Sequence, residues 1–290
     1  MARTEASPES RLEASWDGPP AGFGGLAGDL RAVRVMWQRE LIRLSRNRIG
    51  SVMSLLTPLL FLLVLGTGMN SVTARAGADG TDYRTYLLPG AVLMVVMAPA
   101  LNTGMSIVWD RHAGFLREML VAPVHRTALI SGICLGGATA ATAHGVLLLM
   151  TAALFGATFA PLLLVPLVME LLAITLAFTA LGALAAVSVE RMETFQSVVG
   201  IAMTPLIFLS GAFFPSNGLP GWLQGAVLAN PLSYATDAMR QTLATDGSGN
   251  TGAGLHWAGW QVPVMLEVAA LSLLALTALA AAARRFSRTD

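Results

Sequence analysis

Two ionisable residues, His144 and Glu170, lie inside long apolar stretches of the sequence. A charged group in hydrocarbon is costly unless it has a partner or faces water, so such residues are candidates for a proton relay or a transport path. The turn between the two stretches falls near 156–160, and each residue lies about 20 Å from it at the helical rise of ~1.5 Å per residue. Similar depth allows the two side chains to meet, either on the translocation path or as a neutral pair that only fixes helix packing.

Other catalytic chemistry is excluded by residue types that are missing or isolated. All 18 basic residues are arginine, so the chain has no lysine for a G-x-x-x-x-G-K-[ST] phosphate loop, a Schiff base or an S-x-x-K site. The single Cys134 lies in an apolar stretch, and the histidines show no metal-ligand spacing. The 4 histidines are His112, His125, His144 and His256. We therefore expect no enzyme activity, no catalytic residue, no metal and no cofactor on this chain.

Composition indicates a membrane protein. The chain has 290 residues, of which 54% are hydrophobic and 12% charged, too few polar groups to cover a soluble protein of this size. Six apolar stretches are long enough to cross hydrocarbon as helices, at about 49–69, 87–108, 129–155, 161–189, 195–214 and 262–283. We expect an all-α membrane protein with six transmembrane helices in one domain at 49–285.

Arginine placement predicts the orientation of these spans. Most arginines fall on one side of a six-span topology, and only Arg75, Arg84 and Arg240 fall on the other. Because positively charged loops stay in the cytoplasm, both termini are expected there.

The chain before the first span has two parts. Residues 1–25 mix proline, glycine, serine and both charge signs without periodicity, which predicts a disordered cytoplasmic tail. Residues 26–48 carry an apolar stripe with arginines elsewhere, which predicts an amphipathic interfacial helix on membrane lipids. Further on, Gly132 and Gly136 form a G-x-x-x-G pattern that allows close helix approach within one subunit or between two.

A short charged segment from Trp109 to Arg126, WDRHAGFLREMLVAPVHR, separates the second and third spans. Apolar residues recur at helical spacing on one face and charged residues occupy the other. Asp110 is a candidate N-cap and Pro123 marks the end. About fourteen residues cannot span a bilayer, so this helix is expected on the cytoplasmic surface. It is either a plain connector or a lever that receives force.

The loop after the fifth span predicts two short helices, at about 221–229 and 231–243. Asn230 followed by Pro231 is typical of an N-cap and a first helical residue. We expect an outer re-entrant hairpin, with surface helices lying flat as the alternative. Three neighbouring residues are candidates for an outer gate: Phe213, Phe214 and Pro215.

Two blocks of sequence resemble the ABC-2 type permeases, the membrane subunits of ATP-binding-cassette exporters, and among them the daunorubicin-resistance-like group. DRHAGFLREMLVAPVHR, from Asp110 to Arg126, resembles the family's cytoplasmic coupling helix. PLIFLSGAFFP, LPGW and NPLSYATDAMR resemble its signature across the fifth span and the outer hairpin. His112 stands where the family commonly has an acidic residue.

The resemblance implies a bacterial inner (plasma) membrane protein that dimerises with a second permease copy or homologue. Each complex would carry two copies of an ATPase subunit, which hold ATP and Mg, and no nucleic acid. Residues implied to couple to the ATPase are Asp110, Arg111, Gly114, Phe115, Arg117 and Glu118.

Few charges in the spans favour efflux of a hydrophobic or amphipathic compound, a drug or a lipid-like molecule, as in multidrug resistance. One alternative is an ABC permease that exports a polysaccharide or lipid-linked glycan. Another is an ion-gradient-driven transporter using Glu170 and His144. A third is a membrane scaffold that moves nothing.

Overall fold

The computed structural model describes residues 25–75, 83–112, 125–155, 160–213, 220–244, 255–257 and 260–286. These parts of the chain are helical apart from connecting turns and one antiparallel pair of two-residue strands, β1 (His256–Trp257) and β2 (Trp260–Gln261). The predicted all-α class is therefore confirmed. The predicted tail, except Gly25, lies outside the described residues.

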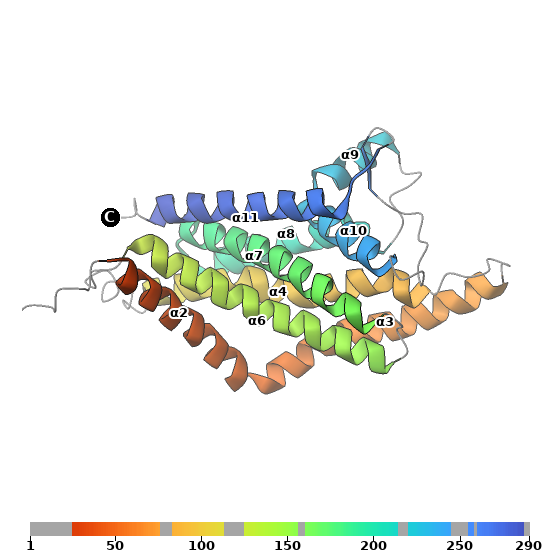
Figure 1. The fold of residues 1–290 in the computed structure, drawn as a ribbon, viewed down its shortest axis with the longest axis horizontal. Helices are drawn as coiled ribbons and strands as arrows, with labels where there is room; N and C mark the ends of the chain where they lie inside the picture. The colour runs from red at the N-terminus through yellow and green to blue at the C-terminus, as the bar shows by residue number, and fades with distance from the viewer. Residues whose placement is uncertain are drawn as a thin grey trace, which may run out of the picture.

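Five helices are long and apolar enough to cross a membrane, and they run side by side along the long axis of the molecule (Figure 1). They are α3 (Arg48–Arg75), α4 (Tyr83–His112), α6 (Arg126–Leu154), α7 (Leu164–Ser188), which follows the 3-10 turn η1 (Pro161–Leu163), and α11 (Val264–Phe286). Each corresponds to a predicted apolar stretch. Long unbroken apolar runs fix these helices because a backbone in hydrocarbon must satisfy its own hydrogen bonds.

The remaining predicted span, 195–214, differs from the prediction. Its helix, α8 (Met192–Phe208), has 17 residues and ends before the turn at Gly211, whose φ of 71° lies in the left-handed region. Left-handed glycines commonly terminate helices because they carry no Cβ to clash. At about 26 Å, α8 is at the lower limit for a spanning helix. Its crossing stays a prediction.

The core of the bundle is α4, whose most apolar window is 78% buried and whose residues pack against α3, α6, α7 and α8. By contrast, the same measure for α3 and for α11 is 22%. Within this chain, α4 is therefore the fixed element around which the other helices are arranged.

Helix α2 (Leu26–Arg46) packs against the first half of α6 (Figure 1). A Cβ atom at Gly132 would lie 2.8 Å from the carbonyl oxygen of Val33, and one at Gly136 would lie 3.2 Å from the Cα of Trp37. The indole Nε1 of Trp37 also donates to Thr139 Oγ1 at 3.1 Å. The predicted G-x-x-x-G contact is thus made within this chain, by α2.

One end of the bundle gathers five arginines, and we call it the arginine-rich end: Arg111, Arg126, Arg191, Arg284 and Arg285. Arg126 Nη1 donates to the carbonyl of Phe286 at 3.5 Å, and Arg285 Nη1 donates to Ser188 Oγ at 2.6 Å. The ends of α6, α7 and α11 therefore meet there. The opposite end carries α9 (Gly221–Ala229) and α10 (Pro231–Ala244) (Figure 1). We call it the hairpin end.

Candidate functional site

The predicted coupling residues are only partly described. Asp110 and Arg111 lie in the last turn of α4, whereas Gly114, Phe115, Arg117 and Glu118 lie outside the described residues. The prediction that Asp110 caps a separate helix is wrong, because α4 continues without a break through His112. Nothing between Val108 and His112 interrupts the helical hydrogen bonds, since neither proline nor glycine occurs there.

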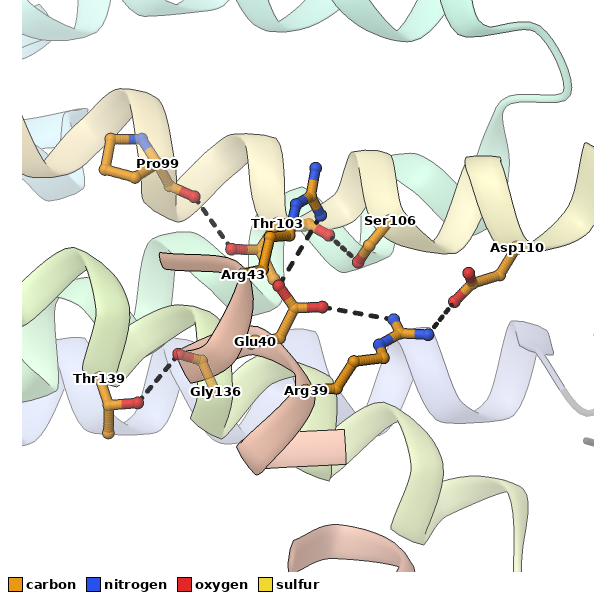
Figure 2. A network of polar contacts seen from close by, with 9 residues as sticks. All are labelled: Arg39, Glu40, Arg43, Pro99, Thr103, Ser106, Asp110, Gly136 and Thr139. Carbon is orange, nitrogen blue, oxygen red and sulfur yellow. Dashed lines mark hydrogen bonds and ion pairs between the residues drawn. The ribbon is translucent and has the colours of Figure 1, made fainter. Parts of the chain in front are cut away.

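A network of ionic contacts joins α2 to this last turn of α4 (Figure 2). Arg39 Nη1 donates to Asp110 Oδ2 at 2.9 Å, and Arg39 Nη2 donates to Glu40 Oε1 at 3.3 Å. Arg43 Nη1 lies 3.8 Å from Glu40 Oε2, so Glu40 stands between two arginines. Glu40 is buried, and a buried acidic side chain is tolerated where cationic partners lie this close. The sequence prediction gave Glu40 no role, although an acid directly between Arg39 and the following arginines of one helix was a usable signal.

A second contact joins α2 to the residue that precedes α6. The backbone N–H of His125 donates to Asp29 Oδ1 at 2.9 Å, and His125 Nδ1 lies 2.7 Å from Asp29 Oδ2. The backbone hydrogen bond, followed by the His125 side chain, lowers the pKa of Asp29 despite some opposing desolvation. Helix α2 therefore contacts the chain on both sides of the segment 113–124, through Asp110 before it and His125 after it.

The same turn of α4 also contacts the junction between α7 and α8. Arg111 Nη1 donates to the carbonyl of Val189 at 3.3 Å, and His112 Nε2 lies 3.0 Å from the carbonyl oxygen of Glu190. A carbonyl oxygen only accepts, so His112 carries its proton on Nε2 in this contact. His112 thus makes a hydrogen bond to backbone and needs no acidic partner at this position.

The predicted pair of ionisable residues, His144 and Glu170, has separate partners. His144 Nδ1 donates to the carbonyl of Ala140 at 2.9 Å, within its own helix. Glu170 Oε1 accepts a hydrogen bond from Thr242 Oγ1 of α10. The imidazole lines a cavity between α2, α3, α4 and α6, whereas the carboxyl faces the hairpin end. In the described part of the chain, the two side chains do not form a hydrogen bond with each other.

The hairpin end is organised by Asn230. Its Oδ1 accepts from the N–H of Leu232 at 3.0 Å, which confirms the predicted N-cap of α10, and its Nδ2 donates to the carbonyl of Leu206 at 2.7 Å. One residue therefore starts α10 and ties it to the end of α8. Ten of the 14 residues of α10 are buried and none is exposed, and α10 packs against α4, α7 and α11. This packing departs from the alternative of two surface helices lying flat, although α9 itself exposes Trp222.

Arg240 of α10 is 5% exposed and holds the turn after α8. Its Nη2 donates to the carbonyls of Gly211 at 2.6 Å and Ala212 at 3.3 Å, and its guanidinium lies 4.1 Å above the ring of Tyr86. Burial lowers the pKa of Arg240, while nearby Tyr86 and Asp237 oppose the shift. Sequence analysis counted Arg240 only as an outside charge, because the paired carbonyls and ring lie far away along the chain.

Of the predicted gate residues, only Phe213 is described, and Phe214 and Pro215 lie outside the described residues. The Phe213 ring meets the ring of Phe61 on α3 edge to face, with centroids 5.0 Å apart. Tyr83 Oη donates to the Phe213 carbonyl at 3.2 Å. Phe213 therefore links the turn after α8 to the middle of α3 and to the first residue of α4.

Comparison with known proteins agrees with this architecture. The family model described as ABC-2 type transporter matches residues 31–244. The chain is similar to Nodulation protein J of Rhizobium meliloti (strain 1021), with 30% identity over 76% of this chain and 84% of that protein. It is also similar to the inner membrane transport permease YadH of Escherichia coli (strain K12), with 26% identity over 72% of this chain and 81% of that protein.

Proposed function

We propose a coupling route that starts from one fact: this chain belongs to the ABC-2 type transporter family. In this proposal the chain is an export permease, and a separate ATPase drives its conformational change by acting on the segment 113–124. Members of this family are the transmembrane subunits of ABC transporters, so the ATPase activity belongs to a partner chain. The direction of transport, the cargo and the coupling route are not given by the family and are proposed here. Each complex would contain two copies of the ATPase subunit, which would bind ATP and Mg. This chain would pair with a second permease copy or a homologue.

The observation that carries the coupling route is the pair of contacts from α2 to both flanks of this segment. Arg39 binds Asp110 before it and Asp29 binds His125 after it. A force on the segment must either break these contacts or move α2 with it. Since α2 is one helix of 21 residues, such a displacement reaches its far end, where α3 begins.

We place the partner ATPase, the cytoplasm and both termini at the arginine-rich end, in a bacterial inner membrane. Positive charge on this side accords with the distribution of arginines in membrane proteins. The proposed cargo is a hydrophobic or amphipathic compound. Support comes from the wide apolar surfaces of α3 and α11, which leave room for lipid or for a second copy.

A polysaccharide or lipid-linked glycan is the second candidate cargo, which the family leaves open. An ion-gradient-driven mechanism has less support, because His144 and Glu170 hydrogen-bond to different helices. If that mechanism operated, transport would persist after ATP depletion and would cease when the proton gradient collapsed.

The test is a double-mutant cycle with Arg39→Gln and Asp110→Asn in the full complex, together with the ATPase that co-purifies. Each single variant should keep ATP hydrolysis while cargo export falls several-fold. The double variant should lose no more export than Arg39→Gln alone, because Asp110 acts through its contact with Arg39. Arg34→Gln is the matched control, since Arg34 is exposed on the same helix. Export that tracks hydrolysis in all variants would refute this coupling route.

A further inference from the structure

A cavity of about 490 Å³ lies at the elbow where α2 ends and α3 begins, with α4 and α6 on its other side. We call it the elbow cavity. Its size matches small-molecule sites, which usually measure about 300–1,000 Å³. The polar residues that line it are Glu40, Arg43, Asn47, Ser51, Ser54, Asn102, Thr103 and His144.

Two of these polar groups come from membrane-spanning helices. Asn102 of α4 is exposed to the cavity, and its amide forms no hydrogen bond with the described residues. His144 of α6 is 9% exposed, and its Nδ1 is already bonded to the Ala140 carbonyl, which leaves Nε2 for the cavity. Polar groups within a span are costly unless they meet water or a polar ligand. These groups therefore favour a ligand that has a polar part, although apolar residues also line the cavity.

The charge around the elbow favours an anion. Arg43, Arg46 and Arg48 are exposed there, and the contact between Arg43 and Glu40 is long at 3.8 Å, which leaves Arg43 donors available. Glu40, which also lines the cavity, has Arg39 as a second cationic partner at 3.3 Å. Gly50 and Ser51, in the first turn of α3, also line the cavity.

The membrane-facing surface beside the cavity is apolar. Val52, Met53 and Leu56 follow the elbow on α3 and are each more than half exposed. A molecule with a polar head in the cavity could therefore lay its chains along α3. No phenylalanine, tyrosine or tryptophan is among the lining residues, which is unfavourable for a sugar ring that needs a stacking partner.

We propose that the elbow cavity binds the phosphate-bearing headgroup of a lipid from the leaflet nearest the arginine-rich end. Arg43 donates to the phosphate, as guanidinium groups do with doubled hydrogen bonds. The amides of Asn47 and Asn102 donate to its remaining oxygens or to ester oxygens. His144 Nε2, in the tautomer fixed by Ala140, accepts from a headgroup hydroxyl. The acyl chains lie against the first turns of α3.

The experiment measures lipid binding to the purified, delipidated full chain in detergent, without ATPase or nucleotide, so its outcome is separate from that of the proposed coupling. Phosphatidylglycerol, diacylglycerol of the same chain length and free glycerol phosphate are titrated by native mass spectrometry. Phosphatidylglycerol should bind at least tenfold more tightly than either. Glycerol phosphate that binds as tightly as the lipid would indicate a soluble phosphate ester, and diacylglycerol that binds as tightly would indicate chain contacts only. Either result overturns the proposal.

Variants test the location of the site. Arg43→Gln and Asn102→Leu should each weaken phosphatidylglycerol binding about tenfold, since hydrogen bonds to charged groups are among the stronger ones. Arg31→Gln removes the same charge from an exposed site on the same helix, away from the cavity, and should leave binding unchanged. Because Arg43 is exposed, its variant should fold even if Asn102→Leu does not. Equal losses in Arg43→Gln and Arg31→Gln would reduce the effect to general surface charge and contradict the proposed site.

Discussion

Replacing Gly132 by alanine should destabilise the protein by separating α2 from α6. The new Cβ would lie 2.8 Å from the Val33 carbonyl oxygen and 3.0 Å from the Val33 Cα, both backbone atoms of α2. Because no flexible side chain can yield there, α2 itself must move. Alanine gains about 1 kcal/mol of helix propensity over glycine, whereas overpacking costs about 1–3 kcal/mol. The net loss should be about 1 kcal/mol, and up to ~2 kcal/mol if α2 cannot shift.

The assay is the free energy of unfolding in detergent micelles titrated with SDS, followed by helical circular dichroism. Gly225→Ala in α9 is the matched control, because nothing lies within 4 Å of a Cβ placed there. That variant should become slightly more stable through helix propensity alone. If Gly132→Ala is stabilised to the same extent as Gly225→Ala, the close contact between α2 and α6 is absent and the reasoning fails.

Three further predictions concern titratable and charged residues. The backbone hydrogen bond from His125 lowers the pKa of Asp29, so their contact should stabilise the position of α2 at any pH above the ordinary carboxyl pKa. This stabilisation should be lost as the pH falls through the lowered pKa that Asp29 has in the folded protein, and proteolysis of α2 should then become faster. Asp29→Asn should remove this acid dependence of proteolysis. Arg240→Ala should lower the free energy of unfolding by roughly 2 kcal/mol, because two buried carbonyls lose their donor, while Arg34→Ala should change it little. Glu170→Gln should leave the pH dependence of export unchanged, since Glu170 bonds Thr242 and not His144, and a shifted pH profile would restore the proton-relay hypothesis.

The sequence was sufficient for features that depend on local chemistry. Long apolar runs located five of the spans, and Asn230 before Pro231 located the start of α10. Hydropathy and capping act over a few turns, so they can be judged without knowing the neighbours. The end of α8 was placed too late, because the apolar run continues beyond the turn at Gly211.

Contacts between distant segments could not be predicted in the same way. The periodicity of residues 26–48 indicates an apolar face but does not say whether lipid or protein covers it. Arg39 and Asp110 are 71 residues apart, and the sequence around each residue does not indicate that the other is its partner. The elbow cavity also requires four helices to be placed before it exists.

His144 and Glu170 illustrate a related limit. The rise per residue predicts the depth of each side chain, but each step also turns about 100° around the helix axis. Two residues at equal depth can therefore face opposite neighbours. His144 faces α2, α3 and α4, while Glu170 faces α10, a direction that depends on packing partners far away in the sequence.

The light burial of α3 has a mechanical consequence. This helix begins at the elbow, and its Phe61 ring contacts the ring of Phe213. Only 22% of its most apolar window is buried by the rest of the chain, against 78% for α4. Tilting α3 uncovers little apolar surface, whereas tilting α4 would open the core. Moving α3 relative to the rest of the chain should therefore cost less free energy than moving α4. We expect a conformational change that starts at the arginine-rich end to tilt α3 as a rigid helix while α4 stays in place.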